Sequence, residues 1–401
     1  MSAWGGGLGL GAIALGAAFA SGSRPLGVVG VGFLLAWVVT WLWMWLAERP
    51  VALALDVRPD SAREGDRVRL AVEARRTSRV PLGSVTVDLA LGRLGRRSQR
   101  LHGHGRGLTA RIDLGPLPRG VYMIDDAKVV VGDLLGLTSL TPPVAFEKTT
   151  LVVRPRLVAL DGLFCDAGVV GGDGRRLLLR RSAGFDFHSV REYEQGESLR
   201  RVHWPSSARR GQLMVKELED TSHDGVVVVL DCDPAGAVGT PPDSSFDAAV
   251  RAAGSILQAH ATRGRVATLV STGTGCDPVQ VRTAHAELGG AMTSLAAAVA
   301  DAPYDLVRAL RELSARGGGG ELTIVTATRD PTAFAGVLAV AARRPISLVW
   351  VDAASYAGRP TRAEPGVLRL AAHGIPTAVV RHGDDLTAAL SGRVLGAIAH
   401  G

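Results

Sequence analysis

Cysteine and lysine are both scarce in this 401-residue chain. The only cysteines are Cys165, Cys232 and Cys276, and no C-x-x-C spacing occurs. That pattern argues against a disulfide framework or a zinc site, so we expect small buried thiols in a reducing compartment. The net charge of +7 comes almost wholly from arginine. Because the arginines are scattered in short pairs and form no basic helix, we expect no nucleic-acid partner.

Three motifs of common enzyme classes are missing as well. The chain contains no G-x-x-x-x-G-K-[ST], no G-x-G-x-x-G and no G-x-S-x-G. A nucleotide site needs glycine-rich backbone between a strand and a helix, and a hydrolase needs a nucleophile within reach of a base. His203 offers a base without an evident partner. We therefore predict that the protein is not an enzyme and has no catalytic residues.

The first 23 residues carry no charged side chain. Two apolar runs follow one another over the first 47 residues. The first covers Trp4–Ala20 and the second covers Leu26–Ala47, separated by a short polar turn. Each is close to the length that crosses a bilayer, and two helices satisfy their own backbone hydrogen bonds in lipid. Small residues at Gly11, Gly16 and Gly30 would allow close helix packing. Residues 1–47 are predicted to form a transmembrane hairpin.

The ends of the second run indicate its orientation in the cell membrane. Tryptophans cluster at 41, 43 and 45, and arginines follow at 49, 58, 63, 67 and 69, whereas the turn carries only Arg24. Positively charged flanks stay on the cytoplasmic side. We expect a protein with two spans whose N-terminus and large C-terminal part are both cytoplasmic.

Residues 48–160 and 225–401 show two different periodicities. The first range has short β-prone runs with period-2 alternation between turn residues, which predicts an antiparallel β-sandwich. The second alternates apolar strands such as Val226–Asp231 with helical runs such as Phe246–Gly264, which predicts a doubly wound α/β domain. In such domains ligands bind beyond the carboxyl ends of the strands.

The segment between them, residues 161–224, carries the most distinctive motifs of the chain. They include Arg191-Glu192-Tyr193 with Gly196-Glu197, then Arg201-Val202-His203-Trp204, then Ser207-Ala208-Arg209 with Gly211 and Leu213. In this order they resemble the hallmark of the bacterial domain of unknown function 58 family. The β-rich range adds Arg119-Gly120-Val121-Tyr122 and Val153-Arg154-Pro155-Arg156, which also resemble that family.

The resemblance implies that the α/β domain is similar to the von Willebrand factor A type. That type holds a divalent cation with D-x-S-x-S after its first strand. Here the pattern reads Asp231-Cys232-Asp233-Pro234-Ala235, so one carboxylate is kept and Ala235 offers no oxygen ligand. Asp231 and Asp233 could hold Mg²⁺ weakly through water, but we favour a degenerate site in which they cap the following turn. No cofactor is expected.

The resemblance also implies a partner, because such proteins are similar to those encoded beside MoxR-type AAA+ ATPases. We expect a non-enzymatic adaptor or assembly protein for a cytoplasmic ATPase of this type. Its candidate interaction residues are Arg191, Glu192, Tyr193, Arg201, Trp204 and Arg209. The same residues could instead lock the sandwich onto the α/β domain. The alternative function is an outward-facing cell-envelope module that binds a ligand through its α/β domain.

Overall fold

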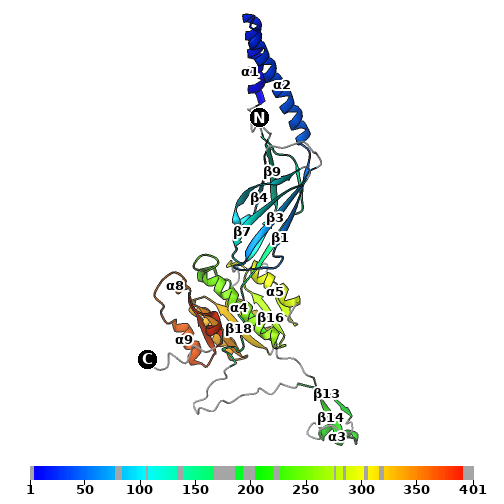
Figure 1. The fold of residues 1–401 in the computed structure, drawn as a ribbon. Helices are drawn as coiled ribbons and strands as arrows, with labels where there is room; N and C mark the ends of the chain where they lie inside the picture. The colour runs from blue at the N-terminus through cyan, green and yellow to red at the C-terminus, as the bar shows by residue number, and fades with distance from the viewer. Residues whose placement is uncertain are drawn as a thin grey trace. The chain divides into compact units, whose positions relative to one another are not determined.

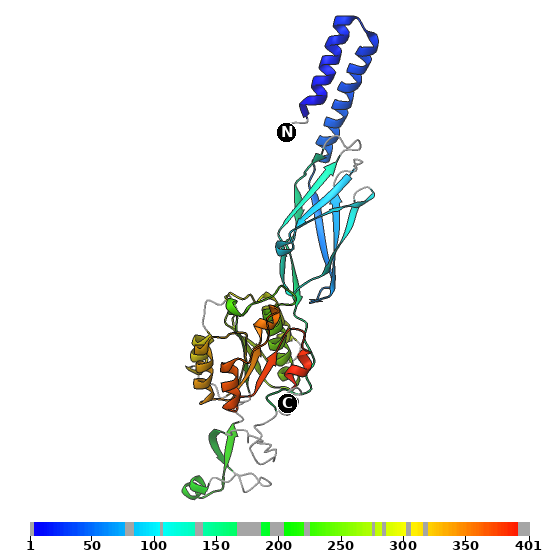
Figure 2. The same ribbon diagram turned by 90° about the vertical axis from the view of Figure 1, so that its left-hand side faces the viewer.

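The computed structural model describes most of the chain in two compact units, Met1–Arg154 and Pro155–Gly401. The described residues are 4–76, 84–104, 107–132, 139–166, 186–192, 204–219, 225–274, 277–282, 286–301, 306–315 and 320–391. Figures 1 and 2 show their helices and strands from two directions. Tyr193 and Arg201 lie outside these ranges.

Two helices, α1 (Trp4–Ser21) and α2 (Arg24–Ala47), open the first unit and pack against each other. A Cβ atom on Gly30 would lie 3.0 Å from the backbone nitrogen of Leu15, and one on Gly11 would lie 3.0 Å from Leu34 Cδ2. These glycines therefore allow the close approach. Gly16 does not take part, because nothing lies within 4 Å of its Cβ position.

One stretch of α2, Arg24–Trp43, is long and apolar enough to cross a membrane, with a mean hydropathy of 2.0. The apolar part of α1 within the described residues, Gly9–Ser21, is shorter. Length and composition alone support this candidate span.

Within the described residues of the first unit, twelve strands follow and form three sheets with orders β11-β1-β3-β7-β6, β10-β9-β4-β5 and β2-β12-β8. The strands are β1 (Val51–Arg58), β2 (Ala62–Arg63), β3 (Arg67–Arg76), β4 (Ser84–Ala90), β5 (Arg96–Arg100), β6 (His102–His104), β7 (Gly107–Pro116), β8 (Gly120–Ile124), β9 (Asp126–Gly132), β10 (Ser139–Leu140), β11 (Val144–Phe146) and β12 (Thr149–Arg154).

The predicted alternation is visible in how these strands are buried. Along β3, the side chains of Val68, Leu70, Val72 and Ala74 are buried, whereas the residues between them are exposed or half-buried. Every second residue of a strand points to the same face, so one face of the sheet forms the core. Leu70 and Val72 pack in a cluster with Val87 and Val129 from the second sheet.

The second unit contains a short antiparallel pair, β13 (Asp186–Glu192) and β14 (Met214–Glu219), with helix α3 (Trp204–Arg210) between them in sequence. All three lie in the hallmark segment.

The rest of this unit is built around a six-stranded sheet of order β17-β16-β15-β18-β19-β20. All neighbouring strands are parallel except the edge strand β17, which is antiparallel to β16. The strands are β15 (Val226–Leu230), β16 (Ala267–Ser271), β17 (Val279–Val281), β18 (Glu321–Thr326), β19 (Ile346–Val351) and β20 (Thr377–Val380).

Helices cover both faces of this sheet. Side chains of α4 (Ser245–Thr262) and α5 (Ala286–Ala297) pack in one cluster, whereas those of α6 (Leu306–Ala315), α7 (Pro331–Ala341) and α9 (Pro365–Ala372) pack in another. The short helices α8 (Ala353–Tyr356) and α10 (Leu386–Leu390) follow β19 and β20.

The α/β core also uses residues from the start of the hallmark-bearing segment. Leu163 and Phe164 are 2% and 6% exposed and belong to the α4–α5 cluster. The Phe164 amide donates to the Leu390 carbonyl at 2.8 Å, and the Val158 amide donates to Ser255 Oγ at 3.0 Å. These residues therefore form part of the domain that begins again at β15.

Candidate functional site

The carboxyl edge of the α/β sheet is the first candidate site. β15 and β18 are neighbours, but the chain leaves β15 for α4 on one face and leaves β18 for α7 on the other. A crevice forms where consecutive connections diverge in this way, and ligands of open α/β sheets bind there. Asp231 follows β15 at this point, Thr272 follows β16 and Thr326 ends β18.

Both oxygens of the Asp231 carboxylate are already hydrogen bonded within the protein. Oδ2 accepts from Thr326 Oγ1 at 2.6 Å, and Oδ1 accepts from Thr272 Oγ1 at 3.5 Å and from the Asp233 amide at 3.3 Å. Asp231 is 5% exposed. Burial raises its pKa, and the Thr326 hydroxyl opposes that rise by stabilising the charged form.

Asp233 has a structural contact of its own. Its side chain accepts from the Ala235 amide at 2.9 Å, which caps a single turn of 3-10 helix over Pro234–Gly236. A Cβ atom on Gly236 would lie 2.9 Å from the Cβ of Ala327. The turn after β15 and the residue after β18 are therefore in close contact.

These residues do not fit a divalent cation site of the D-x-S-x-S kind. A hard cation needs about six oxygen ligands, and Ala235 and Ala327 have no side-chain oxygen to offer. The Asp231 oxygens accept from two threonine hydroxyls and an amide, so a cation would have to displace these donors. Within the described ranges, no three His, Cys, Asp or Glu side chains are grouped to hold a metal.

We expect calorimetric titration of the full-length chain in detergent with Mg²⁺ or Mn²⁺ to give only heats of dilution. The physical reason is that the Asp231 carboxylate is buried and already hydrogen bonded. An Asp231→Ala variant serves as the control. Saturable binding by the parent chain that this variant loses would show that the edge of the sheet is a metal site.

The second candidate site is the hallmark element, by which we mean β13, α3 and β14 within the hallmark segment. Arg191 and Glu192 end strand β13, where they pair with Val215 and Met214 of β14. Helix α3 is fixed to β14 because the Met214 amide donates to Ser207 Oγ at 2.9 Å, and Met214 is 1% exposed.

Around this fixed contact, large side chains of the element remain open to solvent. The Trp204 side chain is 65% exposed at the start of α3, and Leu213 is 39% exposed before β14. Arg209 and Arg210 are exposed at the end of the helix. Exposed tryptophan and arginine side chains on one short helix are typical of an interaction surface, because Trp and Arg dominate binding energy in interfaces.

Sequence reasoning missed a charged cluster on the same edge of the sheet, after β19. The Arg329 guanidinium donates to Asp352 Oδ1 at 3.1 Å and lies 5.9 Å from the Trp350 ring centroid. Asp352 is fully buried, and its Oδ2 has no hydrogen-bond partner within the described part of the chain. Arg329 Nε also lies 3.9 Å from Glu364 Oε2. No motif in the sequence marks these residues.

Comparisons with known proteins match the region that holds the hallmark element. Residues 189–318 match the family described as "Protein of unknown function DUF58". The uncharacterized protein YeaD of Bacillus subtilis (strain 168) is 26% identical over 257 residues, which are 62% of this chain. The chain spans 62% of that relative's length. This match and the family match indicate no catalytic family.

Solved structures show only weak likeness. The bacterial hydrophobin BslA aligns with a TM-score of 0.18 and 11% identity over 26% of this chain and 99% of its own. A CARDB domain from Pyrococcus furiosus aligns with a TM-score of 0.16 and 12% identity, over 24% of this chain and 93% of its own. Neither supports an argument about function.

Proposed function

Because residues 189–318 and the YeaD match place this chain in the DUF58 family of proteins of unknown function, we propose that it is a membrane-anchored adaptor. In this role it is not an enzyme and works with a cytoplasmic MoxR-type AAA+ ATPase. The observation that carries the proposal is the Trp204 side chain of helix α3, which is 65% exposed in the hallmark element.

The anchor in this proposal is a hairpin of two membrane spans, α1 and α2. The candidate span Arg24–Trp43 and the glycine contacts at Gly11 and Gly30 support it. Arg49 follows α2, and the positive-inside rule then puts both soluble parts on the cytoplasmic side, where an ATPase partner can reach them.

The α/β domain in this proposal is of the von Willebrand factor A kind, and the β-rich part is a sandwich. An antiparallel edge strand beside five parallel strands, with helices on both faces, supports the first assignment. The packing of strands from two sheets into one cluster supports the second. The domain works without a resident metal, since Asp231 and Asp233 already bind protein donors.

The docking surface consists of Trp204, Arg209 and Leu213, with Arg191, Glu192, Tyr193 and Arg201 as its other candidate members. A large aromatic side chain buried on binding supplies affinity, and arginines give a directional contact with carboxylates. The partner surface is therefore expected to be acidic with an apolar pocket. This use of Trp204 opposes the interdomain lock, in which the side chain would be buried.

Trp204→Ala is expected to weaken recovery of the ATPase by at least about tenfold, as a lost hot-spot residue costs about 2 kcal/mol or more. Arg209→Glu should also weaken recovery of the ATPase, because it reverses a charge of the docking surface. The measurement is affinity capture of the tagged full-length chain from detergent extract, with and without ATP, read by mass spectrometry. Arg359→Glu, at an exposed arginine of the α/β domain, is the matched control.

The melting temperature of the Trp204→Ala variant distinguishes a docking surface from an interdomain lock. An interface residue that is 65% exposed should leave the melting temperature unchanged when it is truncated. A fall of several degrees for Trp204→Ala, with partner recovery intact, would instead identify the interdomain lock. Recovery of envelope proteins in place of an ATPase would favour the outward-facing ligand-binding module.

Thiol labelling in intact cells distinguishes that alternative independently. Cys232 cannot serve for it, because the side chain is fully buried. A cysteine introduced at the exposed Ala371 of α9 is a suitable site. Labelling by a membrane-impermeant reagent before lysis would place the α/β domain outside, and labelling only after lysis would place it inside.

A further inference from the structure

Helix α7 has no charged side chain along its whole length, PTAFAGVLAVA, although part of it faces solvent. Ala335 and Ala339 are exposed, whereas Phe334 and Val337 pack in the core. A helix at the surface of a globular domain normally carries polar residues on its outer face, and one that is apolar all round is usually covered. The outer face of α7 therefore has the composition of a contact surface.

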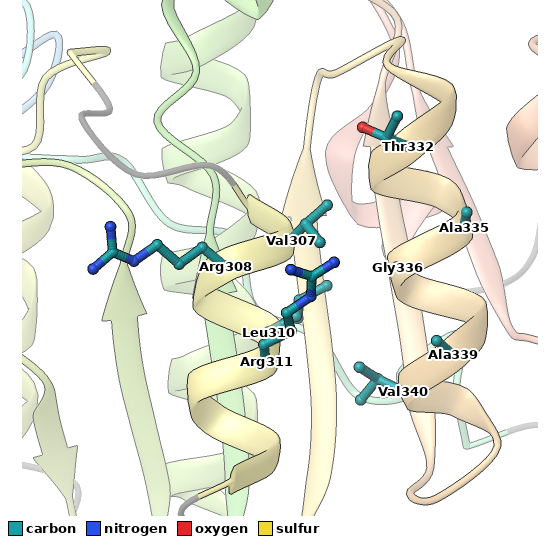
Figure 3. Close-up of a pocket in the computed structure, with 9 residues that line it drawn as sticks. All are labelled: Val307, Arg308, Leu310, Arg311, Thr332, Ala335, Gly336, Ala339 and Val340. Atoms are coloured by element: carbon teal, nitrogen blue, oxygen red, sulfur yellow. The ribbon is translucent and has the colours of Figure 1, made fainter.

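A groove of about 510 Å³ runs between α6 and α7 on this side of the sheet (Figure 3). Val307, Leu310 and Val340 supply its apolar lining. The helices come close because α7 has a glycine at their contact, where a Cβ on Gly336 would lie 3.2 Å from Val307 Cγ2. Along α7, small side chains at 332, 335 and 339 leave room for another backbone to approach.

Positive charge lies on the α6 side of the groove. Arg308 points away from α7 in Figure 3 and pairs with Glu312 at 3.1 Å. Arg311 lies beside the groove between the two helices. No hydrogen bond or ion pair joins Arg311 to the rest of the described chain. Arg343 adds a further exposed positive charge just after α7.

We propose that the α6–α7 groove docks an acidic amphipathic helix of a partner protein. The apolar face of that helix lies on Ala335, Gly336 and Ala339, and a carboxylate on its edge binds the guanidinium of Arg311. Helix-in-groove recognition uses these two components, an apolar stripe and a charged border. A second copy of this chain is a poor occupant, since it would bring its own Arg311 and Arg343 against the same charges.

The groove shares no residue with the docking surface around Trp204, so the two proposals can be tested separately. A photo-crosslinking benzoylphenylalanine replaces Ala335 in the full-length chain, expressed in cells of the source organism. The matched control carries the same residue at Ala297, an exposed alanine of α5, which belongs to the helices on the opposite face of the sheet. The crosslinked segment is then identified by mass spectrometry.

The expected product joins position 335 to an acidic amphipathic helix of another protein and is absent from the Ala297 control. Arg311→Glu should lower its yield about tenfold without changing the melting temperature, because Arg311 is exposed. Three results would overturn the proposal: no product above the control, a product with a second copy of the chain or with lipid, or a yield that Arg311→Glu leaves unchanged.

Discussion

Arg329→Met is expected to lower the free energy of unfolding of the α/β domain by about 3 kcal/mol. The change leaves the carboxylate of Asp352 fully buried without its positive partner. Removing one member of a buried ion pair costs about 3–5 kcal/mol. The Arg329 side chain is 48% exposed, so water weakens the pair and places the cost at the lower end. Guanidinium unfolding followed by circular dichroism measures the change.

Two further variants show whether the buried charge is the cause. Arg359→Met removes an exposed arginine of the same domain and should change the unfolding free energy by less than about 0.5 kcal/mol. Asp352→Asn added to Arg329→Met should recover part of the loss, because the buried group is then neutral. If Arg329→Met behaves like Arg359→Met, the pair does not stabilise the domain.

Acidification is expected to remove about 3 kcal/mol of stability through His260 alone. Burial lowers the pKa of this histidine from 6.5 to about 4, and the nearby positive charges of Arg265 and Arg263 add to the effect. The folded state thus binds fewer protons than the unfolded state between these values. The part of the unfolding free energy that depends on neutral His260 is fully present above pH 6.5. It is lost as the pH falls to 4, at about 1.36 kcal/mol for each pKa unit.

The comparison of two histidine variants isolates this effect from the titration of carboxylates. His260→Gln should make the unfolding free energy less dependent on pH between 6.5 and 4 than it is in the parent chain. His373→Gln, which changes an exposed histidine, should leave the parent dependence intact. Parallel curves for all three proteins would show that His260 is not held neutral by the fold.

The elements of the α/β domain could be predicted closely from hydrophobic periodicity. The expected helix over Phe246–Gly264 is α4, Ser245–Thr262, and it begins where Ser244 accepts from the Asp247 amide. Short helices were harder to predict. α9 has eight residues, Pro365–Ala372, which is little more than two turns of a helical pattern, and the sequence did not predict it.

The candidate sites are formed by contacts between residues far apart in the chain, which the sequence alone does not show. Asp231 could be assigned to the carboxyl edge from its place after a strand, but its hydroxyl donors Thr272 and Thr326 lie at the carboxyl ends of two other strands. Arg329 and Asp352 are 23 residues apart and meet only in the folded sheet. Only the folded domain shows that Ala335 and Ala339 of the apolar helix α7 face outward.

The hallmark element interrupts a domain in sequence and does not merely precede it. The α/β core includes Leu163 and Phe164 before this segment and continues with Val226 after it. The element is therefore an insertion, framed on both sides by residues of one core. An insertion of this kind can change in length or be exchanged between relatives while the host core stays the same. Residues 189–318, which match the DUF58 family, include most of the insertion and part of its host core, so we expect relatives to keep the two together.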